Sequence, residues 1–239
     1  MKVGLTLPQF GEDPEACIEV ARQAEAAGLD GVFVFDHLWA IGRPDRPALH
    51  GPCLLAALAV ETRRLRVGTL VARVGLVADD LLVGALATLS AMAGNRLVAG
   101  LGTGDRLSED ENRAFGVPFP SVADRWASLA DCCSRLRRLG IETWVGGLSA
   151  GTRAVGRTAS DALNFWDVAP GVVADELARP DSVPVTWGGR VDLSAGGGFA
   201  ATLLRSLTDA GASWAVVAPI GVPWPAAVEV VAEARQTVA

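Results

Sequence analysis

The chain has two histidines, and His37 follows an aspartate directly after the apolar run GVFVF at residues 31–35. Histidine gives or takes a proton near neutral pH, so the pair Asp36–His37 could carry out proton transfer. The alternative is a polar strand end at which the imidazole bonds to the backbone. The other histidine, His50, lies in the proline-rich segment GRPDRPALHGP, and we expect it in a surface loop.

A second candidate acid, Asp105, ends the glycine-rich segment GLGTGD at residues 100–105. Its carboxylate could exchange a proton opposite His37, or it could be a helix N-cap or a loop carboxylate. The segment is not a dinucleotide-binding motif, because GxGxxG would need glycine at position 105, and no GK[ST] follows. Its glycines do allow the backbone to approach a ligand closely.

A second glycine turn, GGLS at residues 146–149, precedes a helical pattern in which Ser149 is the candidate N-cap. Free backbone N–H groups at such a helix start suit a phosphate, although an ordinary strand-to-helix turn has the same composition. Trp166 and Trp187, near predicted strand ends, either line an apolar pocket or pack the core. The sequence predicts no metal site and contains no GxSxG motif.

The elements that position these residues follow one repeating pattern. Short apolar runs rich in β-formers alternate with helical patterns, which is typical of a parallel sheet covered on both faces. The predicted strands lie near 3–7, 31–35, 65–71, 96–102, 143–147, 162–166, 184–187 and 213–218, and the first four helices near 14–27, 52–62, 79–92 and 122–139.

Eight such strand–helix units, with no linker between them, predict a single (β/α)8 TIM-barrel domain over residues 1–239. Glycines just past the predicted helix ends, as in AAGLDG and DAGASW, support the turns back into the next strand. The active site of such a barrel lies at the C-terminal ends of its strands. This rule places Asp36, His37, Asp105, the glycine turns and Leu70–Arg73 on one rim. The seventh strand is expected to end in residues 187–189 and the eighth at Pro219.

Composition excludes several classes of protein. The net charge of −6 argues against nucleic acid as a partner, and the short basic runs at 63–66 and 135–138 are expected at solvated helix ends. We expect no signal peptide and no membrane span. The four cysteines show no CxxC and no histidine at metal-ligand spacing, so they are expected to be reduced, in a cytoplasmic protein.

Taken together, the rim segments resemble the luciferase-like monooxygenase superfamily, in particular short actinobacterial-type members that use the deazaflavin coenzyme F420. The resemblance runs in order through KVGLTLPQF, EAAGLDGVFVFDHL, AALAVETRRLRVGTLVARV, LATLSAMAGNRLVAGLGTGD and ETWVGGLSAGTRAVGRTASDALNFW. It implies a luciferase-like TIM barrel with shortened insertions and a homodimer packed through the early helices.

The resemblance also implies roles for single residues. Asp36 would hydrogen-bond the deazaflavin ring, His37 would handle charge on the reacting system, and Asp105 matches an active-site carboxylate of sugar-phosphate dehydrogenases. Leu70–Val71 falls where the family has a non-proline cis peptide. The cofactor-binding set is Asp36, Leu70, Val71, Arg73, Thr103, Gly104, Ser108, Gly146, Gly147 and Ser149.

The leading hypothesis is therefore an oxidoreductase that moves a hydride between F420 and a small organic substrate, with His37 or Asp105 supplying the proton. The alternatives are an FMN-dependent monooxygenase, a non-catalytic flavin- or deazaflavin-binding protein, and a barrel that has lost cofactor binding. Two departures from the family bear on the substrate. Residues 167–184 contain no lysine, which argues against a sugar phosphate, and aspartate in place of glutamate at position 105 shortens the reach of that acid.

Overall fold

Parallel strands form the inner wall of a closed barrel in the computed structural model, which describes residues 1–238 and, for Arg106, the backbone alone. Their side chains are buried on both faces, because one face meets the barrel interior and the other meets the helices. The eight main strands are β1 (Lys2–Thr6), β2 (Gly31–Val34), β5 (Arg66–Thr69), β7 (Leu97–Gly102), β8 (Glu142–Gly146), β9 (Ala162–Trp166), β10 (Val185–Asp192) and β11 (Trp214–Ile220). Each pairs with the next in this order, and β11 pairs with β1, so the ring closes as predicted.

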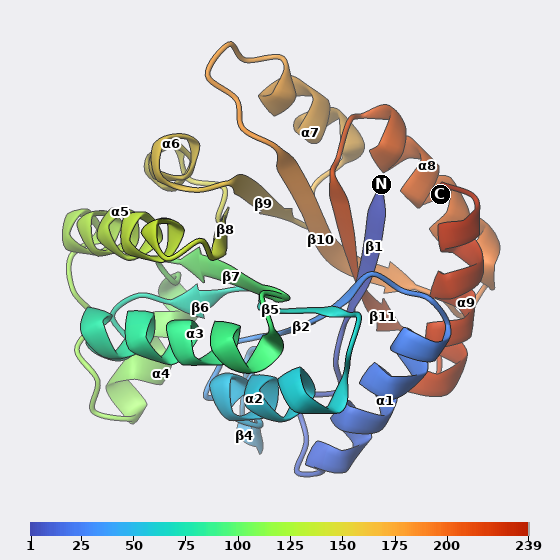
Figure 1. Ribbon diagram of the computed structural model, residues 1–239, viewed down its shortest axis with the longest axis horizontal. Coiled ribbons are helices and arrows are strands. Elements are labelled where there is room, and N and C mark those ends of the chain that lie inside the picture. The colour runs from blue at the N-terminus through green and yellow to red at the C-terminus, as the bar shows by residue number, and fades with distance from the viewer. Residues whose placement is uncertain (239) are drawn as a thin grey trace.

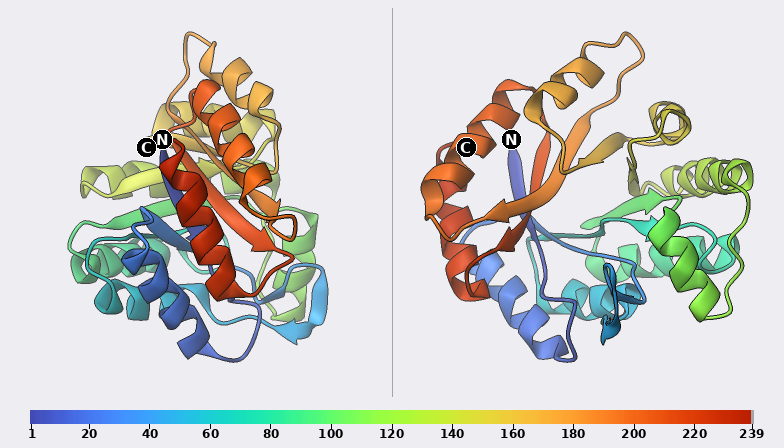
Figure 2. Two further views of the ribbon diagram at one scale, coloured as in Figure 1. Left: turned by 90° about the vertical axis from the view of Figure 1, so that its right-hand side faces the viewer. Right: turned by 180° about the vertical axis from the view of Figure 1, so that it is seen from behind.

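Helices follow the strands and cover the outside of the barrel (Figures 1 and 2). They are α1 (Pro14–Ala26), α2 (Gly51–Glu61), α3 (Asp79–Ala93), α5 (Val122–Arg138), α6 (Ala150–Ala159), α7 (Pro170–Leu177), α8 (Gly197–Asp209) and α9 (Trp224–Gln236). Gly28 and Gly211, which follow α1 and α8, have φ of 80° and 88°. The glycines therefore make the left-handed turns that the sequence predicted after these helices.

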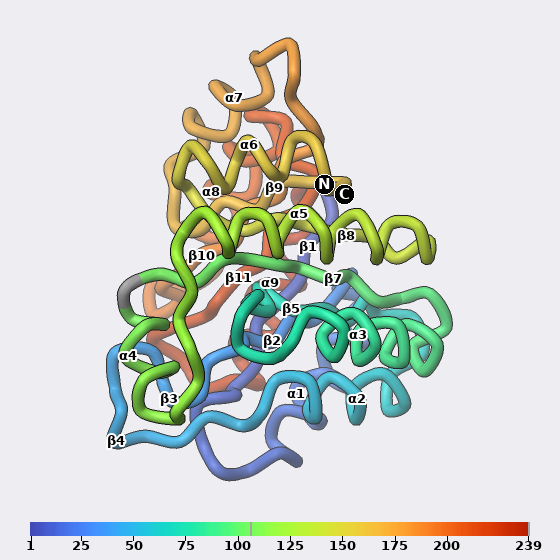
Figure 3. Tube along the Cα trace, turned by 90° about the vertical axis from the view of Figure 1, so that its left-hand side faces the viewer, coloured from blue at the N-terminus to red at the C-terminus, as the bar shows by residue number. Residues whose placement is uncertain are grey.

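Four elements were not predicted. They are the hairpin β3 (Trp39–Ala40) and β4 (Arg43–Pro47), the short strand β6 (Ala72–Arg73) and the helix α4 (Arg106–Ala114). The sequence RLSEDENRA of α4 has one large apolar residue, so hydrophobic periodicity could not reveal it. The hairpin and α4 lie side by side at one end of the barrel (Figure 3), where the rings of Trp39 and Phe115 are 5.9 Å apart.

Two strands run past their predicted ends. β10 continues past residues 187–189 to Asp192, and β11 ends at Ile220 rather than Pro219. The pairing between these strands runs on through Asp192 opposite Ile220. Glycine has a low strand propensity, so Gly188 and Gly189 look like a strand end in sequence, but the neighbouring strand holds them in the sheet.

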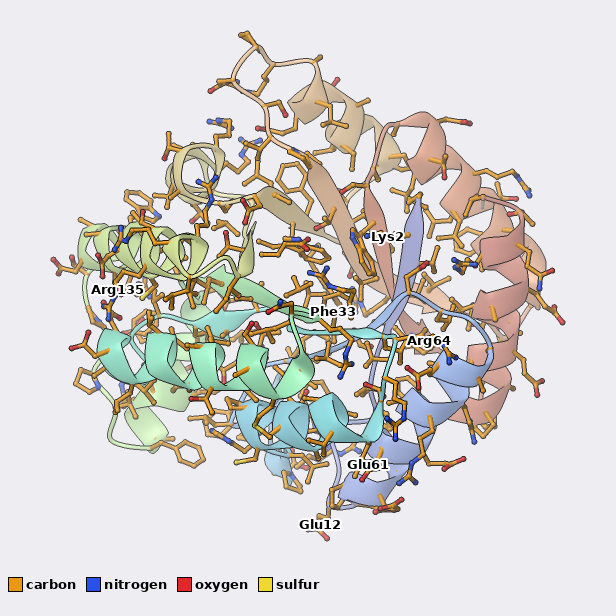
Figure 4. All side chains as sticks on the ribbon, in the orientation of Figure 1. Lys2, Glu12, Phe33, Glu61, Arg64 and Arg135 are labelled. Atoms are coloured by element: carbon orange, nitrogen blue, oxygen red, sulfur yellow. The ribbon has the colours of Figure 1, made fainter. Side chains whose placement is uncertain are left out.

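Aromatic rings fill the interior of the barrel. Phe33 stacks on Trp144 at 5.3 Å between centroids and meets Trp214 edge-on at 5.8 Å. Phe33 points to the barrel centre in Figure 4, and a Cβ at Gly68 would lie 2.8 Å from its ring. Trp187 is 3 % exposed and donates its indole N–H to the Val168 carbonyl, so this residue packs in the core. Of Trp166 and Trp187, which the sequence placed either at a pocket or in the core, Trp166 is the one that lines the cavity described below.

The four cysteines are free thiols that differ in burial. Burial raises the pKa of Cys17, Cys132 and Cys133 to about 12, whereas Cys53 is exposed. A thiol reacts with alkylating agents as the thiolate, which is scarce well below the pKa. We expect iodoacetamide at pH 8 to modify the folded protein once, at Cys53, and the urea-unfolded protein four times. Mass spectrometry of the wild type and of Cys53→Ser counts the adducts; a buried cysteine modified as fast as Cys53 would contradict the burial pattern.

Within residues 1–238, every helix is too short or too polar to span a lipid bilayer.

Candidate active site

A cavity of about 550 Å³ opens at the C-terminal ends of the barrel strands. This size suits a small-molecule site. Of the twelve residues that the sequence proposed for the site, eleven line the cavity: His37, Leu70, Val71, Arg73, Thr103, Gly104, Asp105, Ser108, Gly146, Gly147 and Ser149. His37 follows β2 and Ser149 follows β8, which are three places apart around the barrel, so the cavity spans much of its mouth.

Asp36 is the proposed residue that does not line the cavity. Its side chain is buried, and its Oδ2 accepts the backbone N–H of Arg73 at 2.9 Å. Burial raises the pKa of this carboxyl above its ordinary value, against the opposing hydrogen bond and positive charge of Arg73. Asp36 thus holds the β6 backbone beside the cavity, and its hydrogen bond to a cofactor ring stays a prediction.

His37 is held by a buried carboxylate. Its Nδ1 lies 2.7 Å from Oε1 of Glu111, a residue of α4 that is 1 % exposed. Oε2 of the same glutamate accepts the backbone N–H of Leu38 at 3.3 Å. An ionised glutamate accepts hydrogen bonds only, so Nδ1 carries the proton in this contact, and Nε2 is the nitrogen left to exchange a proton with a molecule in the cavity.

Arg73 completes this cluster through Oε2, the carboxylate oxygen of Glu111 that His37 does not contact. Its Nη2 lies 2.8 Å from Glu111 Oε2, an ion-pair contact without the angle of a hydrogen bond. Its Nε donates to the Asp36 carbonyl at 2.9 Å and its Nη1 to Asn112 Oδ1 at 3.3 Å. With a side chain only 5 % exposed, Arg73 is engaged with Glu111 and Asp36 and presents little charge to the cavity.

Asp105 is a helix N-cap, which is one of the two roles that the sequence left open for it. It is the N-cap of α4, and its Oδ1 accepts both the N–H and the Oγ–H of Ser108, at 3.0 and 3.1 Å. Ser108 Oγ accepts the Asp105 N–H in return at 3.1 Å, which completes a capping box. The side chain of Asp105 is exposed at the cavity rim, where its catalytic role stays a prediction.

The second glycine turn leads into α6 as predicted. Ser149 is the N-cap: its Oγ accepts the Thr152 N–H at 3.1 Å and donates to Thr152 Oγ1 at 2.8 Å. Gly147 has φ of 140°, and a Cβ there would lie 2.9 Å from Thr152 Cγ2. A positive helix end and exposed backbone therefore meet at this side of the cavity, which favours an anion.

Arg125 on α5 lines the same cavity and supplies the matching positive charge. The residue is only 9 % exposed, and its Nε and Nη1 are buried without a hydrogen-bond partner among the described residues. Its guanidinium stacks on the Phe119 ring at 3.8 Å, and burial lowers its pKa from the ordinary value. Buried donors normally have partners, so an unpaired guanidinium in a cavity that a helix N-terminus also lines indicates a site for a phosphate or another oxyanion.

Val71 lines the cavity and packs against the glycines of neighbouring strands. The Leu70–Val71 peptide is cis, as the family resemblance implied. The Val71 side chain packs against strand glycines: a Cβ at Gly102 would lie 2.5 Å from Val71 Cγ2, and one at Gly146 would lie 2.7 Å from Cγ1. The glycines of these strands are thus required by the close approach of Val71.

We expect Gly102→Ala to lower the free energy of unfolding by about 1–3 kcal/mol, because the new methyl overpacks the wall at Val71. Gly84→Ala in α3 is the matched control. A Cβ at Gly84 meets no atom within 4 Å, so this change should raise stability by about 0.5–1 kcal/mol. Urea unfolding followed by circular dichroism measures both; equal stabilities for the two variants would contradict the packing of Val71.

Sequence reasoning missed Glu111 and Arg125. Ser108, Glu111 and Asn112 are the buried positions of α4, and their i, i+3 and i, i+4 spacing marks one polar face of a helix. Arg125 occupies a position of the buried stripe that continues through Leu129 and Cys132. An arginine at a core position of an amphipathic helix is the sequence feature that could have identified Arg125 as a candidate site residue.

Residues 1–153 of the chain match the luciferase-like monooxygenase family. The chain belongs to this family. Two F420-dependent glucose-6-phosphate dehydrogenases are among its relatives. The one from Intrasporangium calvum is 34 % identical over 149 residues (59 % of this chain, 43 % of the relative), and the one from Amycolatopsis mediterranei is 29 % identical over 218 residues (84 % and 57 %). The chain thus spans about half the length of the curated relatives it matches.

Solved structures confirm the luciferase-like barrel fold. An F420-dependent secondary alcohol dehydrogenase in complex with an F420-acetone adduct superposes with a TM-score of 0.80 at 13 % identity, covering 100 % of this chain and 99 % of that one. The oxygenating constituent of 3,6-diketocamphane monooxygenase from Pseudomonas putida, in complex with FMN, gives 0.73 at 13 % identity, with 98 % and 97 % covered. One fold thus carries both kinds of chemistry in these relatives, so the fold alone does not choose between the cofactors.

Proposed function

We propose that the protein is an oxidoreductase that transfers a hydride between coenzyme F420 and a small organic substrate. The observation that carries the proposal is that one cavity holds both the guanidinium of Arg125, whose buried Nε and Nη1 have no hydrogen-bond partner among the described residues, and the His37–Glu111 hydrogen bond. The first suits the phosphate of a bound cofactor, and the second suits proton transfer next to its ring.

The residues present fit a phosphate-bearing, flat cofactor. Arg125 and the N-terminus of α6 at Ser149 would hold the phosphate, and Leu70 and Val71 offer an apolar wall to a ring system. When bound, F420 supplies or accepts a hydride at its central ring carbon. The choice of F420 over FMN is supported by the F420-dependent sequence relatives. An FMN-dependent monooxygenase is the second candidate, because FMN also carries a phosphate.

His37 supplies or removes the proton that accompanies the hydride. Its Nε2 takes the proton of a substrate hydroxyl when the substrate is oxidised, or returns it to the oxygen when a carbonyl is reduced. Glu111, 2.7 Å from Nδ1, stabilises the imidazolium that forms. Arg73 and the buried surroundings keep the glutamate in place, so the pair is arranged before a substrate binds.

A homodimer belongs to the same proposal. Val60 on α2 is 62 % exposed, and Leu81 and Met92 on α3 are 67 % and 43 % exposed, which suits packing between early helices. Sedimentation velocity measures the mass in solution.

Titration of the purified protein with F420 and with FMN, followed by quenching of tryptophan fluorescence, tests the proposal. We expect F420 to bind and FMN to bind more weakly. Binding of FMN with no binding of F420 would favour the monooxygenase. Binding of neither cofactor would contradict both candidate functions. His37→Ala is then expected to keep F420 binding but lose F420-dependent turnover; unchanged turnover would remove His37 from the mechanism.

A further inference from the structure

The charges around the cavity limit what a substrate can be. Among the described side chains that line it, the charged or titratable ones are His37, Arg73, Asp105 and Arg125. Arg73 is paired with Glu111, and Arg125 is the cation with which the proposed cofactor phosphate would pair. The single lysine of the chain, Lys2, lies over the Trp214 ring at the start of β1, at the opposite end of the barrel.

No cation among these side chains therefore remains for a second phosphate, and the exposed carboxylate of Asp105 at the rim repels one. An anionic group moved into this space would lose its hydration without gaining a partner among the described side chains, which is costly. The cavity thus selects against sugar phosphates and other anionic substrates.

The half of the cavity near His37 is apolar. Phe35 lies two residues before His37 and meets the Trp166 ring edge-on at 5.6 Å. Ile41 follows His37 by four residues and is 42 % exposed, and Leu107 is 47 % exposed. Leu107 lies one helical turn before Glu111, which holds His37, so it shares a face of α4 with that residue. Exposed apolar side chains at a cavity mouth, close to a proton carrier, favour an apolar ligand that covers them.

We infer that the substrate is an uncharged, largely apolar alcohol or the corresponding carbonyl compound. This inference rests on the proposed function. In the oxidative direction the carbinol C–H bond breaks and its hydride goes to F420. The O–H proton goes to His37 Nε2, and a C=O bond forms. The two electrons leave with the hydride, and reduction of the carbonyl is the reverse.

The test compares two alcohols that differ by one phosphate, cyclohexanol and 4-hydroxycyclohexyl phosphate, with glucose 6-phosphate as a third substrate. F420 binding is measured first, by fluorescence quenching. The absorbance of F420 then measures the turnover of each alcohol. A further change in fluorescence measures the binding of cyclohexanone to the F420-loaded protein. We expect kcat/KM for cyclohexanol to exceed that of either phosphate by at least about 100-fold, because an unpaired anion is desolvated in the cavity.

A charge-adding variant tests the position of the substrate. Leu107→Arg places a cation near His37, and we expect it to lower kcat/KM for cyclohexanol about 10-fold and raise that for 4-hydroxycyclohexyl phosphate about 10-fold. Leu139→Arg is the matched control, since Leu139 is 57 % exposed at the end of α5 and does not line the cavity. It should leave both values unchanged.

The outcomes separate the two proposals. Binding of F420 with equal or better turnover of glucose 6-phosphate overturns the substrate class and leaves the proposed function standing. Binding of F420 with neither turnover of cyclohexanol nor binding of cyclohexanone also overturns the substrate class. Failure to bind F420 overturns the proposed function, and this inference with it.

Discussion

Replacing Arg125 with methionine is expected to weaken F420 binding by about 100-fold, because charge-assisted hydrogen bonds from a guanidinium to a phosphate are worth roughly 1.5–3 kcal/mol. Methionine keeps most of the volume against Phe119 and removes the unpaired buried donors. The free energy of unfolding without cofactor should therefore stay the same or rise by about 1 kcal/mol, since replacing a buried charge by an apolar group is often stabilising. Fluorescence titration and urea unfolding measure the two effects.

Arg135→Met on the same helix is the control. Arg135 lies on the side of α5 that faces α3 (Figure 4) and pairs with Asp80 of α3 and with Asp131 of its own helix, both of which are exposed. Surface ion pairs contribute little, so this change should leave F420 affinity unaltered. If Arg125→Met binds F420 as the wild type does, the phosphate does not lie at Arg125. Weaker F420 binding together with an unchanged or higher free energy of unfolding is specific to a ligand site. Loss of an arginine that serves only the fold would instead lower the free energy of unfolding.

Replacing Glu111 with glutamine is expected to lower F420-dependent kcat about 100-fold, the size usual for loss of proton-transfer assistance. Glutamine keeps the shape of the side chain but not the charge that stabilises the imidazolium of His37 and pairs with Arg73. Glu111 does not contact the cofactor in this proposal, so the Kd of F420 should stay within a few-fold of the wild type. Glu111→Asp keeps the charge and should recover part of the lost rate.

Asp110→Asn provides the control on the same helix. Asp110 pairs with Arg113 at the surface of α4, where its side chain is 67 % exposed. Turnover should not change in this variant. Thermal unfolding of the three proteins shows whether loss of rate accompanies loss of fold. A folded Glu111→Gln protein with wild-type kcat would mean that Glu111 serves stability alone and does not assist His37.

The sequence by itself determined the barrel and the rim. Eight apolar strands separated by helices are typical of a barrel, which buries both faces of its strands, and barrel geometry then places every strand end on the same side. This reasoning predicted that His37, Asp105 and the glycine turns would line one cavity, and they do. The N-cap at Ser149 and the turns at Gly28 and Gly211 were predictable for the same reason, because caps and turns depend on neighbouring residues.

The tertiary structure alone decided which side chains meet inside the cavity. His37 and Glu111 are 74 positions apart, and Glu111 belongs to α4, a helix with no apolar stripe to reveal its buried face. Asp105, which the sequence left open as an acid opposite His37 or as an N-cap, caps that helix, and the helix brings Glu111 to the histidine. Arg125 could be recognised as an unpaired guanidinium only after every neighbouring acceptor had been placed. Periodic patterns and caps are local properties of a chain, whereas pairing between distant polar side chains depends on how whole elements pack, and a single sequence does not record that packing.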